Sequence, residues 1–323
     1  MKRNFISMKL IYSMFITIAL LLQVRGFAQE GTEEPTGPDN RPSKPAFESG
    51  LLFDQQTSNV QQKHAFEFVI QHRFGTVENG LKKDMYGLWG ASNIRLGLNF
   101  TFTKNLLLGW GMTKYNKAQD FQIKYNVIQQ TRSNSFPVTI TLYGDMQINC
   151  MEATDTNSFG TNFKFADRLS YFSQLIISRR FNNHLSMQIA PSFTHYNWLR
   201  VDTINIKSDP SLPFPTKDAT AWEHDKIGIS FGVRYKISPQ TSLIAAADIP
   251  LKIKGIAEYK EFINPPKPNY SIGAEISTST HAFHLFFTTS QAILPQETMM
   301  KNQNDFFNRQ FLLGLNITRL WNF

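Results

Sequence analysis

The sequence predicts an all-β fold: a closed, antiparallel transmembrane β-barrel of about twelve strands, with ten or fourteen strands also compatible. Three observations lead to this class. Apolar and polar residues alternate along most of the chain. Short and long connections alternate between the resulting strands. An export signal begins the chain, and an aromatic residue ends its last strand.

The alternation is clearest in residues 93–102 (NIRLGLNFTF), where every second residue is apolar and most residues between are polar or small. Successive side chains of a strand point to opposite faces, so one face of this segment is apolar. Strands of about ten residues suit a tilted crossing of a bilayer, whereas strands in soluble sheets average about five or six. Comparable segments occupy 65–73, 121–127, 138–148 and 227–237, and weaker ones 106–113, 168–180, 185–198, 242–250, 270–278, 281–289 and 310–323.

The connections between these segments alternate in length. Four tight joins lie at 103–105, 181–183, 238–240 and 279–280, and the join near 129–136 is moderate. Outer-membrane barrels have tight periplasmic turns and longer outer loops. We therefore assign these joins to the periplasm, where an even strand count also places both chain ends. The alternate joins, apart from a short one near 114–119, are long: 74–92, 149–167, 199–224, 252–267 and 290–309.

Residues 1–28 have the layout of a secretory signal peptide. Basic residues precede an apolar run at 11–22, and Gly26 and Ala28 occupy the positions that a signal peptidase reads. Translation could start at Met1 or Met8, and the run is short for an uncleaved membrane anchor. We expect residues 29–60, rich in Pro and Glu, to be a flexible periplasmic tail, and residues 61–323 to form the barrel.

Charge and composition exclude several classes of protein. The signal segment holds four basic and no acidic residues, so its removal lowers the formal net charge from +8 to +4. This small net charge over so long a chain does not indicate a basic nucleic-acid-binding surface, so no nucleic-acid partner is expected. Apart from the N-terminal run, no stretch is apolar enough for a membrane helix. The single Cys excludes a disulfide framework and a Cys-built zinc site.

The C-terminal segment 310–323 alternates and ends in an aromatic residue. Trp321 and Phe323 share one face, and we expect them to act as the signal for membrane insertion. A soluble β-sandwich also has alternating strands, but it would not combine long strands, an export signal and this terminus.

Two stretches carry a resemblance to a known family. HRFGTVENGLKKDMYGLWGASNIRLGLNFTFTKNLLLGWG (72–111) resembles the opening hairpin of a family of exported β-barrels of unknown function. SPQTSLIAAADIPL (238–251) is similar to that family's turn and strand ahead of a Pro. The resemblance extends over residues 60 to 323. It implies an outer-membrane barrel and brings no established activity, ligand or catalytic residue.

Charged residues on the polar faces of the strands are the candidate functional residues. Lumen charges can select solutes, or opposite charges can pair across the lumen and close it. About twelve strands make a narrower barrel than the ~16–18 strands of water-filled porins, which favours a closed or slightly leaky lumen. The predicted lumen-lining residues are Glu67, Arg73, Arg95, Lys124, Asp145, Arg234, Asp248 and Glu275.

The sequence contains no recognisable catalytic or metal-binding pattern. His281 and His284, three residues apart, fall on opposite faces of a strand. No Ser and His spacing singles out a nucleophile and its base, and Cys150 stands alone. We therefore expect no catalytic residue, no metal and no cofactor.

Three functions fit these observations. The first is a non-enzymatic scaffold or partner component of the envelope with a narrow lumen. The alternatives are a small-solute channel or transporter and, least favoured, a lipid-modifying barrel enzyme. The expected location is the outer membrane of a Gram-negative bacterium, reached through a cleaved signal peptide. The expected partners are outer-membrane lipid and the barrel-insertion machinery. An envelope protein is a further candidate partner.

Overall fold

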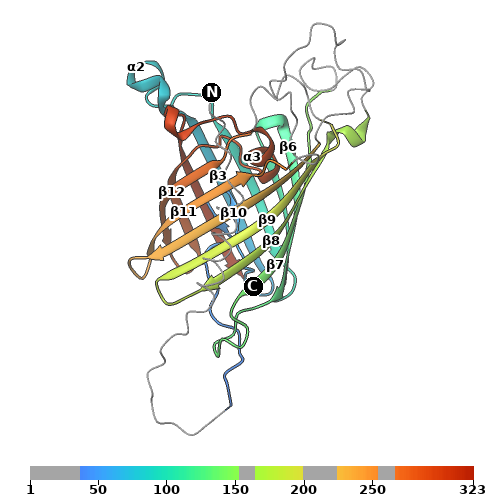
Figure 1. Ribbon diagram of the computed structural model, residues 1–323, viewed down its shortest axis with the longest axis vertical. Helices are drawn as coiled ribbons and strands as arrows, with labels where there is room; N and C mark the ends of the chain where they lie inside the picture. The colour runs from blue at the N-terminus through green and yellow to red at the C-terminus, as the bar shows by residue number, and fades with distance from the viewer. Residues whose placement is uncertain (1–36, 153–163, 199–223, 254–265) are drawn as a thin grey trace.

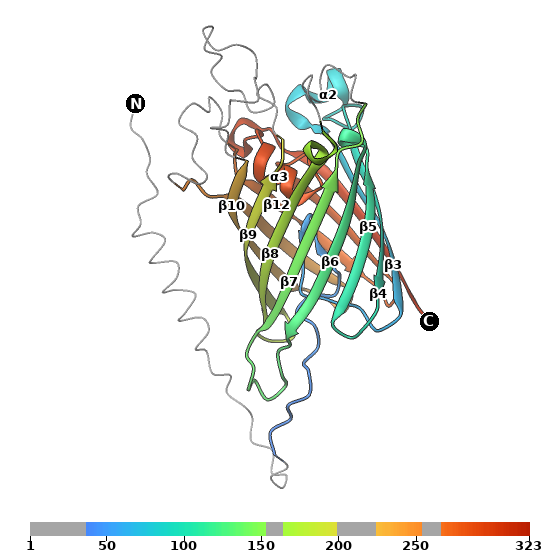
Figure 2. The same ribbon diagram turned by 90° about the vertical axis from the view of Figure 1, so that its right-hand side faces the viewer.

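The computed structural model describes residues 37–152, 164–198, 224–253 and 266–323. Within these residues twelve antiparallel strands close into one barrel, as Figures 1 and 2 show. The strands are β3 (Ala65–Thr76), β4 (Asn93–Thr101), β5 (Leu106–Thr113), β6 (Ala118–Ile128), β7 (Thr139–Ile148), β8 (Leu169–Arg180), β9 (Leu185–Tyr196), β10 (Asp225–Lys236), β11 (Thr241–Pro250), β12 (Asn269–Ser277), β13 (His281–Thr288) and β14 (Leu312–Asn322).

Each barrel strand pairs with its neighbours in the chain, and the last strand closes the ring on the first. β14 pairs with β3 from Leu312 opposite Thr76 to Asn322 opposite Ala65, with one register shift between Leu312 and Gly314. A closed ring leaves no strand edge with unpaired backbone groups, which a bilayer would penalise. The predicted fold class and its strand count of twelve are confirmed.

The predicted alternation of apolar and polar residues corresponds to the outward and inward faces of the barrel wall. Along β6, inward residues are buried and outward residues are exposed in turn. Large apolar side chains therefore cover the outside of the barrel, as expected for a wall in contact with lipid. Exposed members of this outer face include Leu96, Met112, Phe121, Ile123, Tyr125, Val127, Leu142, Phe193, Ile272 and Leu285. Among the described residues, no helix combines the length and apolar character needed to cross a bilayer.

The two ends of the barrel differ in their connections. At one end, here called the turn end, lie residues 37–45, Phe323 and the connections 102–105, 129–138, 181–184, 237–240 and 278–280 (Figure 2). At the other, the loop end, lie connections 77–92, 114–117 and 289–311 and the described parts of three longer connections, 149–152, 164–168, 197–198, 224, 251–253 and 266–268. The predicted alternation of short and long connections is thus confirmed. The signal segment 1–28 and most of the Pro-rich connection 199–224 fall outside the described residues.

Short helices occur only in the loop-end connections among the described residues. The largest is α3 (Pro295–Lys301), which lies at the barrel mouth in Figure 1. The others are η1 (Val77–Asn79), α2 (Gly80–Asp84), η2 (Tyr115–Lys117), η3 (Phe165–Arg168) and η5 (Phe306–Asn308).

The structure differs from the sequence expectation for the tail 29–60. Residues 46–59 lie inside the barrel, and most of their side chains are buried. Leu51, Leu52 and Phe53 show no strand period, so the sequence pattern placed them with the Pro-rich tail. They are buried because a ring of twelve strands leaves an interior that must be filled. Of the described residues of the tail, residues 37–45 stay outside the barrel.

Candidate functional site

The lumen is entered from the turn end by a segment that we call the plug, residues 46–59. Within it, β1 (Leu51–Leu52) and β2 (Gln55–Gln56) pair antiparallel around Phe53 and Asp54. Phe53 has a φ of 58°, a left-handed conformation that costs a bulky residue about 1–3 kcal/mol. Its ring stacks on Phe286 of β13 at 4.2 Å between centroids, and this packing offsets the strain.

An apolar cluster holds one side of the plug against the barrel wall. Leu52 approaches β10 where the wall has Gly232, and a Cβ at that position would lie 2.6 Å from Leu52 Cδ1. The missing side chain therefore makes the space in which the plug sits. The buried members of the cluster are Ala46, Phe47, Leu52 and Phe53 of the plug and Ile244 and Phe286 of the wall.

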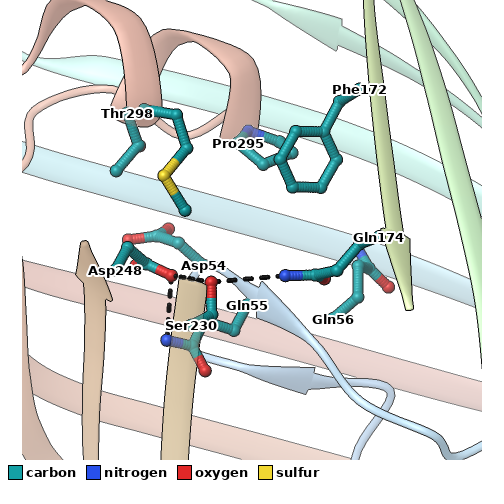
Figure 3. A pocket seen from close by; sticks show the side chains of 10 residues that line it. Asp54, Gln55, Gln56, Phe172, Gln174, Ser230, Asp248, Pro295 and Thr298 are labelled. Atoms are coloured by element: carbon teal, nitrogen blue, oxygen red, sulfur yellow. Dashed lines mark hydrogen bonds between the residues drawn. The ribbon is translucent and has the colours of Figure 1, made fainter. Parts of the chain in front are cut away.

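Polar contacts also hold the plug against the wall. Gln55 Nε2 lies 2.9 Å from Asp248 Oδ1 and 3.0 Å from the carbonyl oxygen of Ala247. Figure 3 shows Gln55 facing Asp248, which also accepts a hydrogen bond of 2.7 Å from Ser230. Further along, the hydroxyls of Ser58 and Ser178 are 2.5 Å apart. These contacts tie the plug to β8, β10 and β11.

Two cations of the wall also reach the plug. The Arg73 guanidinium forms an ion pair with Asp54, and both side chains are almost fully buried. Lys124 Nζ donates a hydrogen bond of 3.2 Å to the carbonyl oxygen of Gly50. Asn316 Nδ2 donates one of 2.7 Å to the carbonyl oxygen of Phe53. The plug is therefore bound through charge and hydrogen bonds as well as through its apolar cluster.

The loop end of the lumen is occupied by α3. Pro295 stands at the first turn of this helix, where its missing N–H costs nothing. Met299 is buried in a cluster with Tyr143, Phe172, Ile176 and Ala190 of the wall. A Cβ at Gly228 of β10 would lie 2.6 Å from Met299 Sδ. The same strand thus provides glycine space for both elements that enter the lumen.

Polar residues of α3 contact β7 of the wall and the connection η2. Gln296 Nε2 donates to Asp145 Oδ1 at 2.9 Å. Glu297 Oε1 accepts hydrogen bonds of 3.0 Å from Gln147 Nε2 and 3.0 Å from Asn116 Nδ2. Burial raises the pKa of the Glu297 carboxyl, and the nearby Lys301 ammonium only partly offsets this effect. The helix is thus held by amide donors around a buried acid.

We expect docking of α3 to weaken as the pH rises. The docked state raises the pKa of Glu297, so it binds a proton more tightly than the released state. The contribution of protonated Glu297 to docking is complete below the ordinary pKa of 4.5. It is lost as the pH rises through the raised pKa of the docked state. Hydrogen exchange of residues 294–302, corrected for intrinsic rates, should be faster at pH 8 than at pH 5. Glu297→Gln should remove this difference, and equal protection of the native chain at both pH values would contradict the prediction.

The plug and α3 meet inside the barrel across a small cavity. Its volume is about 10 Å³, which is room for about one water molecule. Figure 3 shows Thr298 and Pro295 above it and Asp54 and Gln55 of the plug below. The two elements thus occupy the lumen in series, one from each end. The lining residues are Asp54, Gln55, Gln56, Phe172, Gln174, Ser230, Asp248, Pro295, Thr298 and Met299.

The structure places all eight predicted lumen residues on the inward face. Their relative exposure is at most 6%. Arg73 and Asp248 contact the plug, and Asp145 contacts α3. The eight are Glu67, Arg73, Arg95, Lys124, Asp145, Arg234, Asp248 and Glu275.

Three of the eight predicted charges form ion pairs within the wall itself. Arg95 Nη2 lies 2.5 Å from Asp120 Oδ2, and Arg234 Nε lies 2.8 Å from Glu275 Oε1. Glu67 Oε2 accepts a hydrogen bond of 2.8 Å from Asn99. These charges pair along the wall rather than across the lumen, and the lumen is occupied by the plug and α3.

Sequence reasoning missed three acids of the lumen. Asp120 continues the inward face of β6, and the alternation would have included it had the strand been started at Ala118. Asp54 fell within the assigned tail, and Glu297 within a loop without a strand period. Neither carries a local signal, because each is placed by a segment folding back into the barrel.

The predicted insertion signal lies at the turn end. Trp321 packs against Phe66 of the neighbouring strand at 5.7 Å between ring centroids, and the Arg319 guanidinium lies 4.8 Å from its ring. Phe323 follows β14 and is exposed. Both residues are thus available at the end of the last strand, where their role in insertion stays a prediction.

Several solved structures of membrane barrels are similar to this chain. The NanC porin is 7% identical, with a TM-score of 0.44 over 80% of this chain and 100% of that one. The COG4313 outer membrane channel from Pseudomonas putida F1 is 12% identical, with a TM-score of 0.46 over 82% and 97%. The KdgM porin is 6% identical, with a TM-score of 0.39 over 80% and 99%. No curated protein matches the chain.

A family model matches residues 47–321, which include nearly all of the plug as well as every strand of the barrel. The model is described as a membrane bound beta barrel domain (DUF5777). The match covers most of the chain and agrees with the closed ring and the apolar outer face. The chain therefore belongs to this family of membrane-bound β-barrel domains.

Proposed function

We propose that this protein is a non-enzymatic outer-membrane barrel that conducts small solutes and is closed in the present state by its plug and by α3. The observation that carries the proposal is the polar wall behind the plug. Arg73, Lys124 and Asp248 are buried and each contacts the plug. Apolar packing would fill a permanently closed lumen at least as stably as buried charges do. In a state in which the plug has left the lumen, water covers the wall, and polar side chains are then the ones that suit it.

The hydrogen bonding of the lumen supports the same reading. Among the described residues, several buried polar atoms at the plug and α3 have no hydrogen-bond partner, including Asp54 Oδ2, Arg73 Nε and Ser192 Oγ. Unpaired buried polar groups cost about 1–3 kcal/mol each, and water would satisfy them. When the plug withdraws, water can therefore bind these polar groups, and their hydration offsets part of the free energy that withdrawal costs.

The proposed orientation places the turn end in the periplasm. Residues 37–45 leave the barrel there and pair with the connection between β6 and β7 through a bridge of Pro42 with Thr131. Ser43 N donates to the carbonyl oxygen of Gln130 at 2.7 Å. In this orientation, export by a cleaved signal peptide delivers the tail to the periplasm, within reach of an envelope protein.

A scaffold without transport is the second candidate. It is favoured by the occupation of the lumen from both ends, because a solute would have to displace two elements in series. In that case the plug would act as a permanent interior core, and the exposed tail and loops would carry the function.

Conductance in planar bilayers separates the two candidates. The full chain should show brief openings, and a variant lacking residues 37–59 should show longer ones, because the turn-end half of the lumen is then empty. The twelve-strand ring does not include the deleted residues, so the barrel should still form and migrate differently in SDS before and after boiling. If the deletion variant conducts and the full chain never does, gating by the plug is excluded and the scaffold is supported.

A further inference from the structure

The outer wall of the barrel has a deep apolar groove that faces the bilayer. Its volume is about 530 Å³, within the ~300–1000 Å³ usual for ligand pockets. The groove lies over β10 to β13, and η5 with Phe311 forms its border at the loop end. The outward side chains that line it are Phe231, Val233, Ala245, Ala247, Tyr270, Ile272, Phe287, Phe306, Phe307 and Phe311.

Small residues of one strand create the groove. Ala245 stands between Val233 and Ile272 in the strand pairing, and Ala247 stands between Phe231 and Tyr270. Each alanine is therefore a notch between two large neighbours. Elsewhere on the lipid-facing wall, large apolar side chains fill the corresponding outward positions of several strands, such as Ile123 and Leu142.

The aromatic border extends the notch beyond the strands. Phe307 is 89% exposed and Phe306 49% exposed, although both belong to a connection rather than to the barrel wall. Asp305 fixes their position, because its side chain accepts a hydrogen bond of 2.9 Å from Phe307 N. Two exposed rings fixed beside an apolar groove need an apolar neighbour, and in a bilayer that neighbour is an acyl chain.

A basic residue stands at the loop-end edge of this groove. Arg309 directly follows η5, lies between the groove residues Phe307 and Phe311 in sequence, and is exposed. A guanidinium binds phosphate oxygens in a planar, two-pronged contact. The charge thus lies on the side of the groove where the headgroup of a lipid in the loop-end leaflet would be found.

We infer that the groove binds one acyl chain of an anionic lipid from the loop-end leaflet, with Arg309 contacting its phosphate. The alanine notch receives the chain, and the rings of η5 cover it. The site is separate from the lumen and does not depend on whether the barrel conducts.

Photolabelling in nanodiscs tests the site. The probe is phosphatidylglycerol with a diazirine in one acyl chain, and labelled peptides are mapped by mass spectrometry. Labelling of peptides spanning 270–287 and 305–311 should exceed that of the outward faces of β4 to β6 by at least 5-fold. Uniform labelling around the barrel would overturn the inference.

Substitutions distinguish a bound chain from bulk lipid. Ala245→Phe with Ala247→Phe fills the notch and should lower the local labelling at least 5-fold. Ala274→Phe is the matched control, because Ala274 lies on β12 between Leu243 and Leu285, outside the groove, and should leave labelling unchanged. Arg309→Gln should lower labelling by the phosphatidylglycerol probe more strongly than labelling by an equivalent phosphatidylcholine probe, whose phosphate is balanced by its own choline cation. Equal loss with both probes would contradict the preference for an anionic lipid, no loss with either would contradict the phosphate contact, and unchanged labelling in the filled variant would contradict the site.

Discussion

Replacing Arg73 by Met will release the plug from the lumen. The substitution keeps an unbranched, flexible side chain and removes the cation that faces Asp54, leaving a carboxylate buried without its partner. Breaking a buried pair in this way costs about 3–5 kcal/mol. Because about 1.4 kcal/mol is a factor of ten in an equilibrium, the ratio of released to docked plug should rise by about 100-fold or more.

Hydrogen exchange of residues 46–59 measures this release without reference to transport. The peptide should be protected in the native chain and exchange rapidly in Arg73→Met. The matched control is Arg73→Met with Asp54→Asn, in which no unpaired charge is left and protection should largely return. Protection lost equally in the single and double variants would show that the ion pair does not hold the plug. The double variant would still lack the hydrogen bond of 3.0 Å from Arg73 to Asn316, so full recovery is not expected.

If the barrel conducts solutes as proposed, a cross-link between the plug and the wall will abolish its conductance. Ser58 and Ser178 are in side-chain contact, so Ser58→Cys with Ser178→Cys should form a disulfide under oxidation. Cys150→Ser removes the natural thiol from the experiment. In planar bilayers the oxidised protein should lose at least 10-fold in open time, because the plug can no longer leave.

Reduction of the same molecules supplies the control. A reductant should restore the openings of the double-cysteine protein, and the Cys150→Ser parent should not respond to either treatment. Openings that persist with the disulfide formed would mean that solutes pass without displacement of the plug. The Arg73 variant measures how strongly the plug is bound, and this outcome would show that its movement does not control conductance.

The barrel was predictable from the sequence because its signals are local. The period of two in segments such as 93–102 reflects the geometry of a single strand, whatever the strand pairs with. Connection length follows from sequence spacing in the same way. The inward charges Arg95 and Arg234 could be assigned to the lumen because each shares a face with the polar residues of its own strand.

The contents of the lumen were not predictable, because they depend on contacts between distant segments. Phe53 lies in a short stretch without period, and it contacts Phe286, more than two hundred residues away, only after the ring has closed. Gln296 and Glu297 look like loop residues, and they are buried because the wall that faces them offers Asp145, Gln147 and Asn116. The partners of Arg73 and Asp248 were hidden for the same reason.

The sequence by itself determined a membrane barrel of about twelve strands with one apolar and one polar face, since strand periodicity and connection length are properties of neighbouring residues. Only the tertiary structure decided that this polar face is covered by the chain's own N-terminal segment and by α3. Closing the ring creates an interior whose diameter, charge and glycine gaps at Gly228 and Gly232 exist in no single strand. The segments that fit this interior are chosen by shape and charge that twelve strands build together.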